Sequence, residues 1–324
     1  MANIISFHSY KGGACRSTTC FNTIPYLAQK LGASIASPII LIDADLDSMG
    51  LTLLLTGEDG DLFANGVSSR GVFAGEMPPP RACRTINKID DNAYYKQFVP
   101  VGNRFGLSDN GAVRFLGVNK ADRGSHLKGD PSASTQSLFD VLNPLLSEDI
   151  ALTGEFKGAC AVIFDCATGI QHSAVLASKI SDVIVVCLRP SIQFRASTFY
   201  YLNKKLPMIR SEGGVGGCKV VLLPTAVPNE PYISPAAGQL RREAQKDIIM
   251  ASGNIKNYHW KSNQKLTLCE DMITGGFFGI PEVQRFKLKE DLLYTLHSVN
   301  KAALSEDEER ARGSYEKLAG IIGK

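Results

Sequence analysis

A short glycine turn near the N-terminus carries residue types that suit binding of polyphosphate. Lys11, Gly12 and Gly13 follow a strand-like apolar segment, and Ser17 and Thr18 open a segment with helical character. In such a strand–turn–helix, successive backbone N–H groups face a small concavity, and the helix N-terminus adds a positive dipole. Glycines let the backbone approach the ligand closely. Taken alone, an ordinary glycine-rich turn would be the more frequent interpretation.

Two carboxylates end the next apolar segment. Asp43 and Asp45 close the run that begins at residue 38. Ligands of open α/β sheets bind at the carboxyl ends of the strands, where paired carboxylates suit magnesium and an ordered water. Read alone, such a pair would more often be a solvated strand end. Its interpretation as a magnesium and water site therefore depends on the elements around it.

Those elements alternate as expected for a mostly parallel α/β sheet with helices on both faces. Apolar runs rich in Ile and Val are typical of strands covered on both sides. The predicted strands are 3–8, 38–43, 159–165, 182–188 and 219–223, and the predicted helices between them are 17–31, 171–179 and 192–206. We therefore predict an α/β fold.

The chain is predicted to be a single domain, 1–324, with two less regular parts. A loop-rich insertion covers about 56–131, with 98–101 and 113–118 as further candidate strands. The part from about 235 to 324 is predicted to be mostly helical, since 282–300 and 306–322 carry apolar residues at three- and four-residue spacing. A linker between two domains is the alternative for the insertion.

Composition excludes several classes. The 324 residues are 44% hydrophobic with a net charge of +3, which does not fit a disordered chain. Eight cysteines without repeated spacing do not form a disulfide framework and favour a cytoplasmic location. No apolar run reaches the roughly 20 residues that span a bilayer. Acidic residues 306–309 also argue against a membrane-binding C-terminal helix.

Residues 11–18 resemble the deviant Walker A motif, Lys-Gly-Gly-x-Gly-Lys-Ser/Thr-Thr, of the ParA/MinD family of P-loop ATPases. The matching residues are Lys11, Gly12, Gly13, Ser17 and Thr18. Cys15 replaces the third glycine of the motif, and Arg16 replaces its phosphate-binding lysine. Arginine keeps the charge but differs in shape from lysine, whereas a Cβ at a glycine position can strain the backbone. Asp43 and Asp45 match the family's next strand, and Asp165 followed by Gly169 is similar to its Walker B strand and switch.

The resemblance implies a site with ATP and Mg²⁺ as cofactors. Its nucleotide-binding residues would be Lys11, Gly12, Gly13, Ala14, Cys15, Arg16, Ser17 and Thr18. The metal would be held by Ser17, Asp43 and Asp165. The catalytic residues would be Lys11, which reaches the nucleotide of the other subunit in the family, Arg16, and Asp45, which orients the attacking water.

The implied function is an ATP-binding dimerisation switch with slow, Mg-dependent ATP hydrolysis, acting in positioning or partition of DNA or a protein cargo. The implied partners are a second copy of the chain, non-specific DNA and a protein activator or cargo. The candidate DNA-binding residues are Lys204, Lys205, Arg210, Lys219, Arg241, Arg242, Lys287 and Lys289. Two alternatives stay open: a catalytically impaired nucleotide-binding or structural scaffold of the same fold, and a P-loop kinase or amidotransferase-related enzyme.

Overall fold

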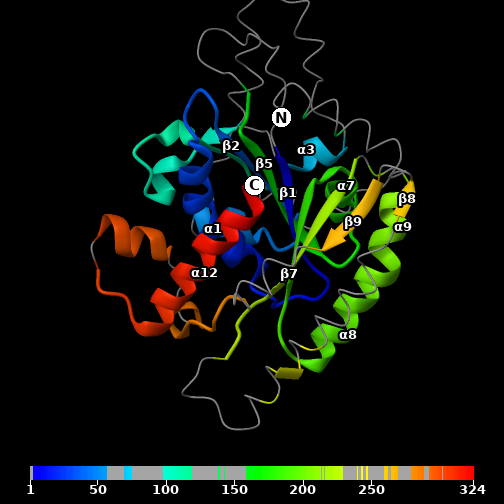
Figure 1. Cartoon of the computed structure of the whole chain (residues 1–324). Coiled ribbons are helices and arrows are strands. Elements are labelled where there is room, and N and C mark those ends of the chain that lie inside the picture. The colour runs from blue at the N-terminus through cyan, green and yellow to red at the C-terminus, as the bar shows by residue number, and fades with distance from the viewer. Residues whose placement is uncertain are drawn as a thin grey trace, which may run out of the picture.

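The computed structural model describes most of the predicted sheet and its flanking helices (Figure 1). The described residues are 3–56, 69–74, 98–118, 138, 142, 158–212, 214, 216–228, 239, 242–243, 246, 259–261, 264–268, 279–287, 292–300 and 302–324.

A twisted sheet forms the centre of the molecule. Its strands within the described residues run in the order β3-β4-β2-β5-β1-β6-β7-β9-β8, with parallel pairing from β4 to β9 and one antiparallel strand at each edge. The strands are β1 Asn3–Ser9, β2 Ile39–Ala44, β3 Val99–Pro100, β4 Val113–Leu116, β5 Ala161–Thr168, β6 Val183–Leu188, β7 Cys218–Pro224, β8 His259–Lys261 and β9 Gln264–Leu268. The α/β fold with a mostly parallel sheet is confirmed.

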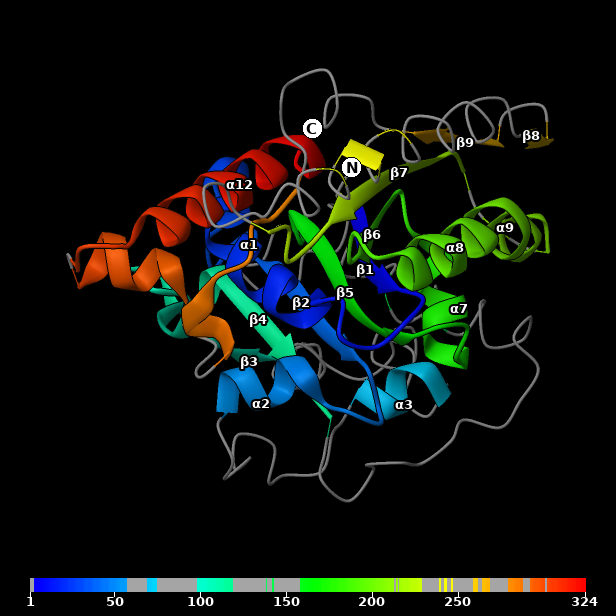
Figure 2. The same cartoon turned by 90° about the horizontal axis from the view of Figure 1, so that it is seen from below.

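Helices cover both faces of this sheet (Figure 2). The α-helices are α1 Arg16–Leu31, α2 Gly50–Thr56, α3 Ser69–Ala74, α7 His172–Ile180, α8 Ile192–Tyr200, α9 Leu206–Ser211 and α12 Glu306–Ile322. Shorter helical turns are η2 Gly102–Phe105, η3 Asn110–Ala112, η5 Tyr201–Lys205, η6 Gln284–Lys287 and η7 Thr295–Val299. Helices α1 and α12 pack together on one face, and α3, α7, η5 and α9 contribute to the core on the other.

Each apolar strand contributes side chains to two hydrophobic cores, one on each face of the sheet. Along β2, Ile39 and Leu41 point into the core beneath α1, whereas Ile40 and Ile42 point into the core beneath α7. All six residues of β2 are buried. Because side chains alternate between the two faces, a strand covered on both sides has to be apolar throughout, which is the pattern that the sequence shows.

The C-terminal helix α12 belongs to this domain core. Ser305 and Glu308 form a capping box at its start, and Tyr315, Leu318 and Ile322 are buried against the α1 side. In the described part of the chain, no helix is both long and apolar enough to cross a bilayer. The predicted helix over 306–322 is therefore confirmed, with its apolar stripe turned inward.

The C-terminal part, predicted to be mostly helical, is not one continuous run of α-helix where the structure describes it. Residues 259–268 contain β8 and β9, so the region from about 235 to 324 is not wholly helical. The predicted helix 282–300 begins instead with a 3₁₀ turn, η6, and includes a π-helical turn, η7. Strand β9 exists because it pairs with β7, a long-range contact that local spacing does not reveal. The predicted strands 98–101 and 113–118 are confirmed as the shorter β3 and β4.

Candidate functional site

The glycine turn lies between the carboxyl end of β1 and the start of α1, as predicted. Lys11, Gly12 and Gly13 are exposed, and Gly13 has a positive φ of 80°. Among the residues that the structure describes, no atom lies within 4 Å of the position that a Cβ would take on Gly12 or Gly13. Thr225, at the end of β7, anchors the turn because its hydroxyl donates a 2.7 Å hydrogen bond to the carbonyl of Ala14. The turn is thus open on the side of Gly12 and Gly13 and fixed at Ala14.

Cys15 occupies the strained position that the sequence predicted. It has φ 51° and ψ 31°, in the left-handed region, and it precedes the first residue of α1 without a side-chain hydrogen bond to the helix. A residue with a Cβ pays roughly 1–2 kcal/mol for this conformation, a cost that glycine avoids. The strain lies in the backbone itself.

A Cys15→Gly variant should therefore unfold at higher denaturant concentration. We expect a gain of about 0.5–1 kcal/mol in the free energy of unfolding, since the relief of strain exceeds the extra entropy of glycine in the unfolded chain. Urea unfolding followed by circular dichroism measures it. Cys15→Ala is the control, because alanine removes the thiol and keeps the strain. Equal gains in the two variants would contradict a backbone origin.

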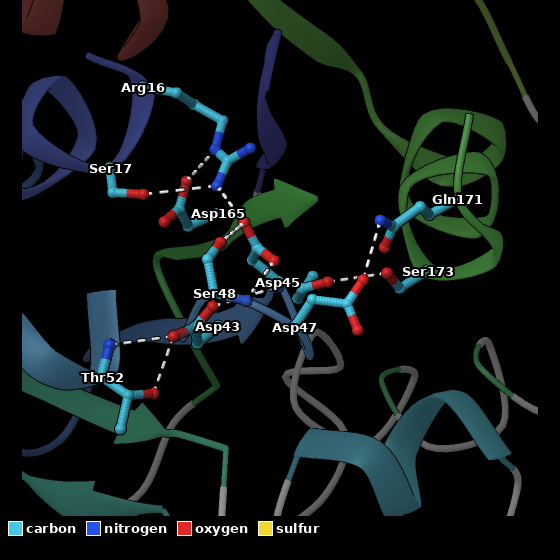
Figure 3. A network of polar contacts seen from close by, with 11 residues as sticks. Arg16, Ser17, Asp43, Asp45, Asp47, Ser48, Thr52, Asp165, Gln171 and Ser173 are labelled. Atoms are coloured by element: carbon cyan, nitrogen blue, oxygen red, sulfur yellow. Dashed lines mark hydrogen bonds and ion pairs between the residues drawn. The ribbon is translucent and has the colours of Figure 1, made fainter. Parts of the chain in front are cut away.

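Arg16 is bound by the carboxylates that the sequence placed at the metal and water positions. Its Nε donates to Asp165 Oδ1 at 2.6 Å, and its Nη2 donates to Asp45 Oδ2 at 2.8 Å (Figure 3). A longer bond of 3.3 Å joins Nη2 to Ser17 Oγ. The Arg16 side chain is 6% exposed and Asp165 is fully buried. The guanidinium is thus the cation at the centre of this network.

The two carboxylates respond differently to this cation. Burial outweighs the charge of Arg16 at Asp165 and raises the pKa of that carboxyl. At Asp45, burial also opposes ionisation, but Arg16 and two hydrogen bonds from Ser48 outweigh it and lower the pKa. Burial likewise disfavours the charge of Arg16, whereas Asp165 and Asp45 raise the pKa of the guanidinium. Arg16 is accordingly a permanent charge.

Asp43 lies beside this network but has partners of its own. It is in register with Asp165 on the neighbouring strand β5. Its Oδ2 accepts bonds from the Thr52 backbone N–H at 2.8 Å and hydroxyl at 2.7 Å, and its Oδ1 accepts the Asp45 N–H at 3.0 Å. Burial and the charge of Asp165 raise the pKa of Asp43 to about 7. Asp43 therefore fastens α2 to β2.

The donor atoms do not fit a magnesium ion in this arrangement. Asp165 Oδ1 and Ser17 Oγ, two of the predicted ligands, are bonded to Arg16, and both oxygens of Asp43 accept hydrogen bonds. Asp165 Oδ2 is buried without a hydrogen-bond partner in the described part of the chain, which leaves a single carboxylate oxygen beside the guanidinium. A divalent ion would meet the positive guanidinium at the same oxygens. Among the described residues, no group of three or more His, Cys, Asp or Glu could hold a metal ion. Magnesium binding by Ser17, Asp43 and Asp165 stays a prediction.

The loop after β2 is held by residues that the sequence analysis did not select. Ser48 bonds Asp45 through both its N–H and its hydroxyl. Gln171 donates to Asp47 at 3.0 Å, and Ser173 donates to the Ala44 carbonyl at 2.6 Å, so α7 braces the same loop (Figure 3). The Asp45–Ser48 spacing is typical of a helix N-cap and could have been found. The contacts from α7 depend on the tertiary fold.

The structure brings the predicted residues of the strand ends to the start of α1 and leaves Lys11 apart from them. Arg16, Ser17, Asp43, Asp45 and Asp165 meet at the carboxyl edge of β2, β1 and β5. Lys11 is exposed on the turn. The structure describes a single chain, so the predicted reach of Lys11 across a dimer is untested.

Fold and site geometry together define a class: the chain has the fold of the ParA/MinD-like P-loop ATPases, with a turn, a helix start and strand-end carboxylates in the expected places. The sequence matches no protein-family model and no curated protein.

Three solved structures illustrate the likeness. A McdA–ATP complex from Cyanothece is 14% identical with a TM-score of 0.60, covering 99% of this chain and 97% of that one. pNOB8 ParA bound to nonspecific DNA is 12% identical with a TM-score of 0.55, covering 99% and 97%. The MinC:MinD cell division complex of Aquifex aeolicus is 15% identical with a TM-score of 0.53, covering 98% and 96%. At such identities the likeness shows the fold alone.

Proposed function

We propose that the chain is an ATP-binding dimerisation switch that acts in the cytoplasm in the positioning or partition of DNA or a protein cargo. The observation that carries the proposal is the meeting of the glycine turn with Arg16, Asp45 and Asp165 at one sheet edge, in the fold of ParA, McdA and MinD. A helix N-terminus and exposed turn amides suit the phosphates of a nucleotide. Measuring ATP binding by calorimetry tests the proposal directly.

Lys11 is the proposed link between two subunits. Its exposure on the turn suits contact with a second chain rather than with its own core. We expect Lys11→Ala to abolish the ATP-dependent increase in molar mass measured by light scattering and to lower any ATP hydrolysis, because the charge supplied in trans is lost. Lys30→Ala, at an exposed position in the last turn of α1, is the control. Normal dimerisation and hydrolysis by Lys11→Ala would exclude this role.

Slow hydrolysis belongs to the same proposal, and one observation favours the catalytically impaired alternative. Asp45, the residue proposed to orient water, is bonded to Arg16 and Ser48 instead. An ATPase assay on the wild type and on the Cys15→Gly, Arg16→Lys double variant separates the two. A large gain of rate in the double variant indicates a scaffold that has lost turnover, whereas a measurable wild-type rate that the double variant does not exceed indicates an active switch.

Two of the candidate DNA-binding residues are engaged elsewhere. Arg210 is fully buried and its Nη1 donates to the carbonyls of Ser178 at 2.8 Å and Ser181 at 3.2 Å. Lys219 donates to the Ile321 carbonyl at 2.9 Å. Both stabilise helix ends and do not form a DNA-binding surface.

Lys204 is exposed on η5, so non-specific DNA binding by the ATP dimer would involve η5 rather than Arg210. Arg241, Lys287 and Lys289 carry no described side chain. Light scattering with ATP and added duplex DNA tests this partner.

The remaining alternative, a P-loop kinase or amidotransferase-related enzyme, needs an acceptor pocket. The region predicted to offer it, 56–131, lies largely outside the described residues. Nothing in the described part of that region supports the alternative over the switch.

A further inference from the structure

Arg16 has bonding capacity that the network does not use. An arginine carries five N–H donors in a planar fork, of which Nε and Nη2 serve Asp165, Asp45 and Ser17 here. Nη1 is buried and has no hydrogen-bond partner within the described part of the chain. Buried charged groups are rarely left with unused donors, because an unmade bond to such a group is costly. The free Nη1 donors therefore point to a ligand that supplies an acceptor.

The position of Arg16 indicates the class of that ligand. Arg16 is the first residue of α1, directly after the glycine turn, so the free donors belong to the same helix start that suits an anion. Each N–H of a guanidinium can donate a strong, charge-assisted hydrogen bond to a phosphate oxygen. The acceptor that fits is therefore a phosphate oxygen of a bound nucleotide, which is why this inference rests on the proposed function.

The same guanidinium occupies part of the oxygen set that a divalent cation would need, and Asp165 Oδ2 is buried beside it without a hydrogen-bond partner among the described residues. The guanidinium contacts one oxygen each of Asp45, Asp165 and Ser17, and its charge would repel a second cation there. A lysine ammonium is a compact point charge with three donors and lacks the planar fork with which Arg16 contacts both carboxylates through separate nitrogens. The replacement of lysine by arginine at this position thus changes what the site can do.

We propose that the Arg16 guanidinium stands in for magnesium: it bridges Asp45 and Asp165, presents Nη1 to a phosphate oxygen, and lets the chain bind nucleoside polyphosphate without a divalent cation. Binding would then be insensitive to chelation. In an Arg16→Lys variant the carboxylate oxygens become accessible to a metal, so nucleotide binding becomes magnesium-dependent.

Calorimetric titration of ADP and ATP into the full chain, with magnesium or with EDTA, tests the proposal. For the wild type we expect dissociation constants that agree within about threefold in the two conditions, and for Arg16→Lys a loss of at least about tenfold on chelation, which is about 1.4 kcal/mol. Arg104→Lys, at an exposed position on η2, is the matched control and should behave as the wild type. A tenfold loss of wild-type affinity on chelation would overturn the magnesium-independent binding proposed here, but would still agree with the proposed nucleotide-binding function.

Direct metal binding separates this proposal from the proposed function. Electron paramagnetic resonance of Mn²⁺ with the nucleotide-free chain should show no bound ion in the wild type and a bound ion in Arg16→Lys. Mn²⁺ bound by the wild type overturns the stand-in role whether or not nucleotide binds. Failure of the wild type to bind ATP or ADP in either condition rejects the phosphate contact and the nucleotide switch together. The wild-type measurements decide the proposal even where Arg16→Lys does not fold.

Discussion

Replacing Arg16 with methionine is expected to lower the free energy of unfolding by about 3–5 kcal/mol, because it leaves two buried carboxylates without a cation to pair with. Asp165 is fully buried and Asp45 nearly so, and each loses a charge-assisted hydrogen bond of 2.6 or 2.8 Å. Methionine keeps the apolar part of the side chain, so the loss of free energy of unfolding measures the contribution of the guanidinium. Urea unfolding at pH 7, followed by circular dichroism, provides the measurement.

The matched control is Arg310→Met on α12. Arg310 pairs with Glu306 one turn earlier, but both side chains are largely exposed. Exposed pairs of this kind contribute less than about 1 kcal/mol. Equal and small effects of the two substitutions would show that the Arg16 network does not stabilise the fold.

The difference between Arg16→Met and the wild type should also depend on pH. Arg16 and Ser48 lower the pKa of Asp45, so the stability gained from this carboxylate is present above its unfolded value and is lost as the pH falls through the folded value. The gap between wild type and variant should therefore narrow in acid. A gap that widens below pH 4 would point to another group.

Much of the fold was predictable because the polarity pattern of a strand indicates which of its faces are buried. A segment such as Ile39–Ala44, covered on both faces, is apolar at every position, and the segments between strands have helical length. Strands β8 and β9 were missed because short runs of mixed polarity become strands only by pairing, β9 with β7 and β8 with β9. Local pattern carries no information on that pairing.

The residue types of the site were predictable, but their partners were not. Sequence order places Arg16 after the glycine turn and Asp45 and Asp165 at strand ends. It does not show that the longer arginine fork reaches back to both carboxylates, which depends on the register of β2 beside β5. Thr52 was missed for the same reason: it becomes a partner of Asp43 only when α2 folds over the end of β2.

That contact gives the second large effect. Thr52→Val should lower the free energy of unfolding by about 2–4 kcal/mol, since valine keeps the shape but removes a hydrogen bond to a buried carboxyl and leaves a backbone N–H unpaired. The Thr52 hydroxyl donates to Asp43 Oδ2 at 2.7 Å and accepts the Val118 N–H at 3.0 Å. Thr52→Ser keeps both bonds and should cost about 1 kcal/mol, the value of a buried methyl group. Urea unfolding of both variants makes the comparison.

The pH dependence of this loss identifies Asp43 as its origin. Burial and Asp165 raise the pKa of Asp43 to about 7, so the folded chain holds this proton more tightly than the unfolded chain, and stability falls as the pH rises from about 4 to about 7. The hydroxyl and the backbone N–H of Thr52 both lower the pKa of Asp43, and Thr52→Val removes the hydroxyl bond alone, which raises this pKa further. Stability of Thr52→Val should then go on falling above pH 7, where that of the wild type levels off. The cost of the substitution is accordingly larger at pH 8 than at pH 5, whereas a loss caused only by the unpaired Val118 N–H would be the same at both.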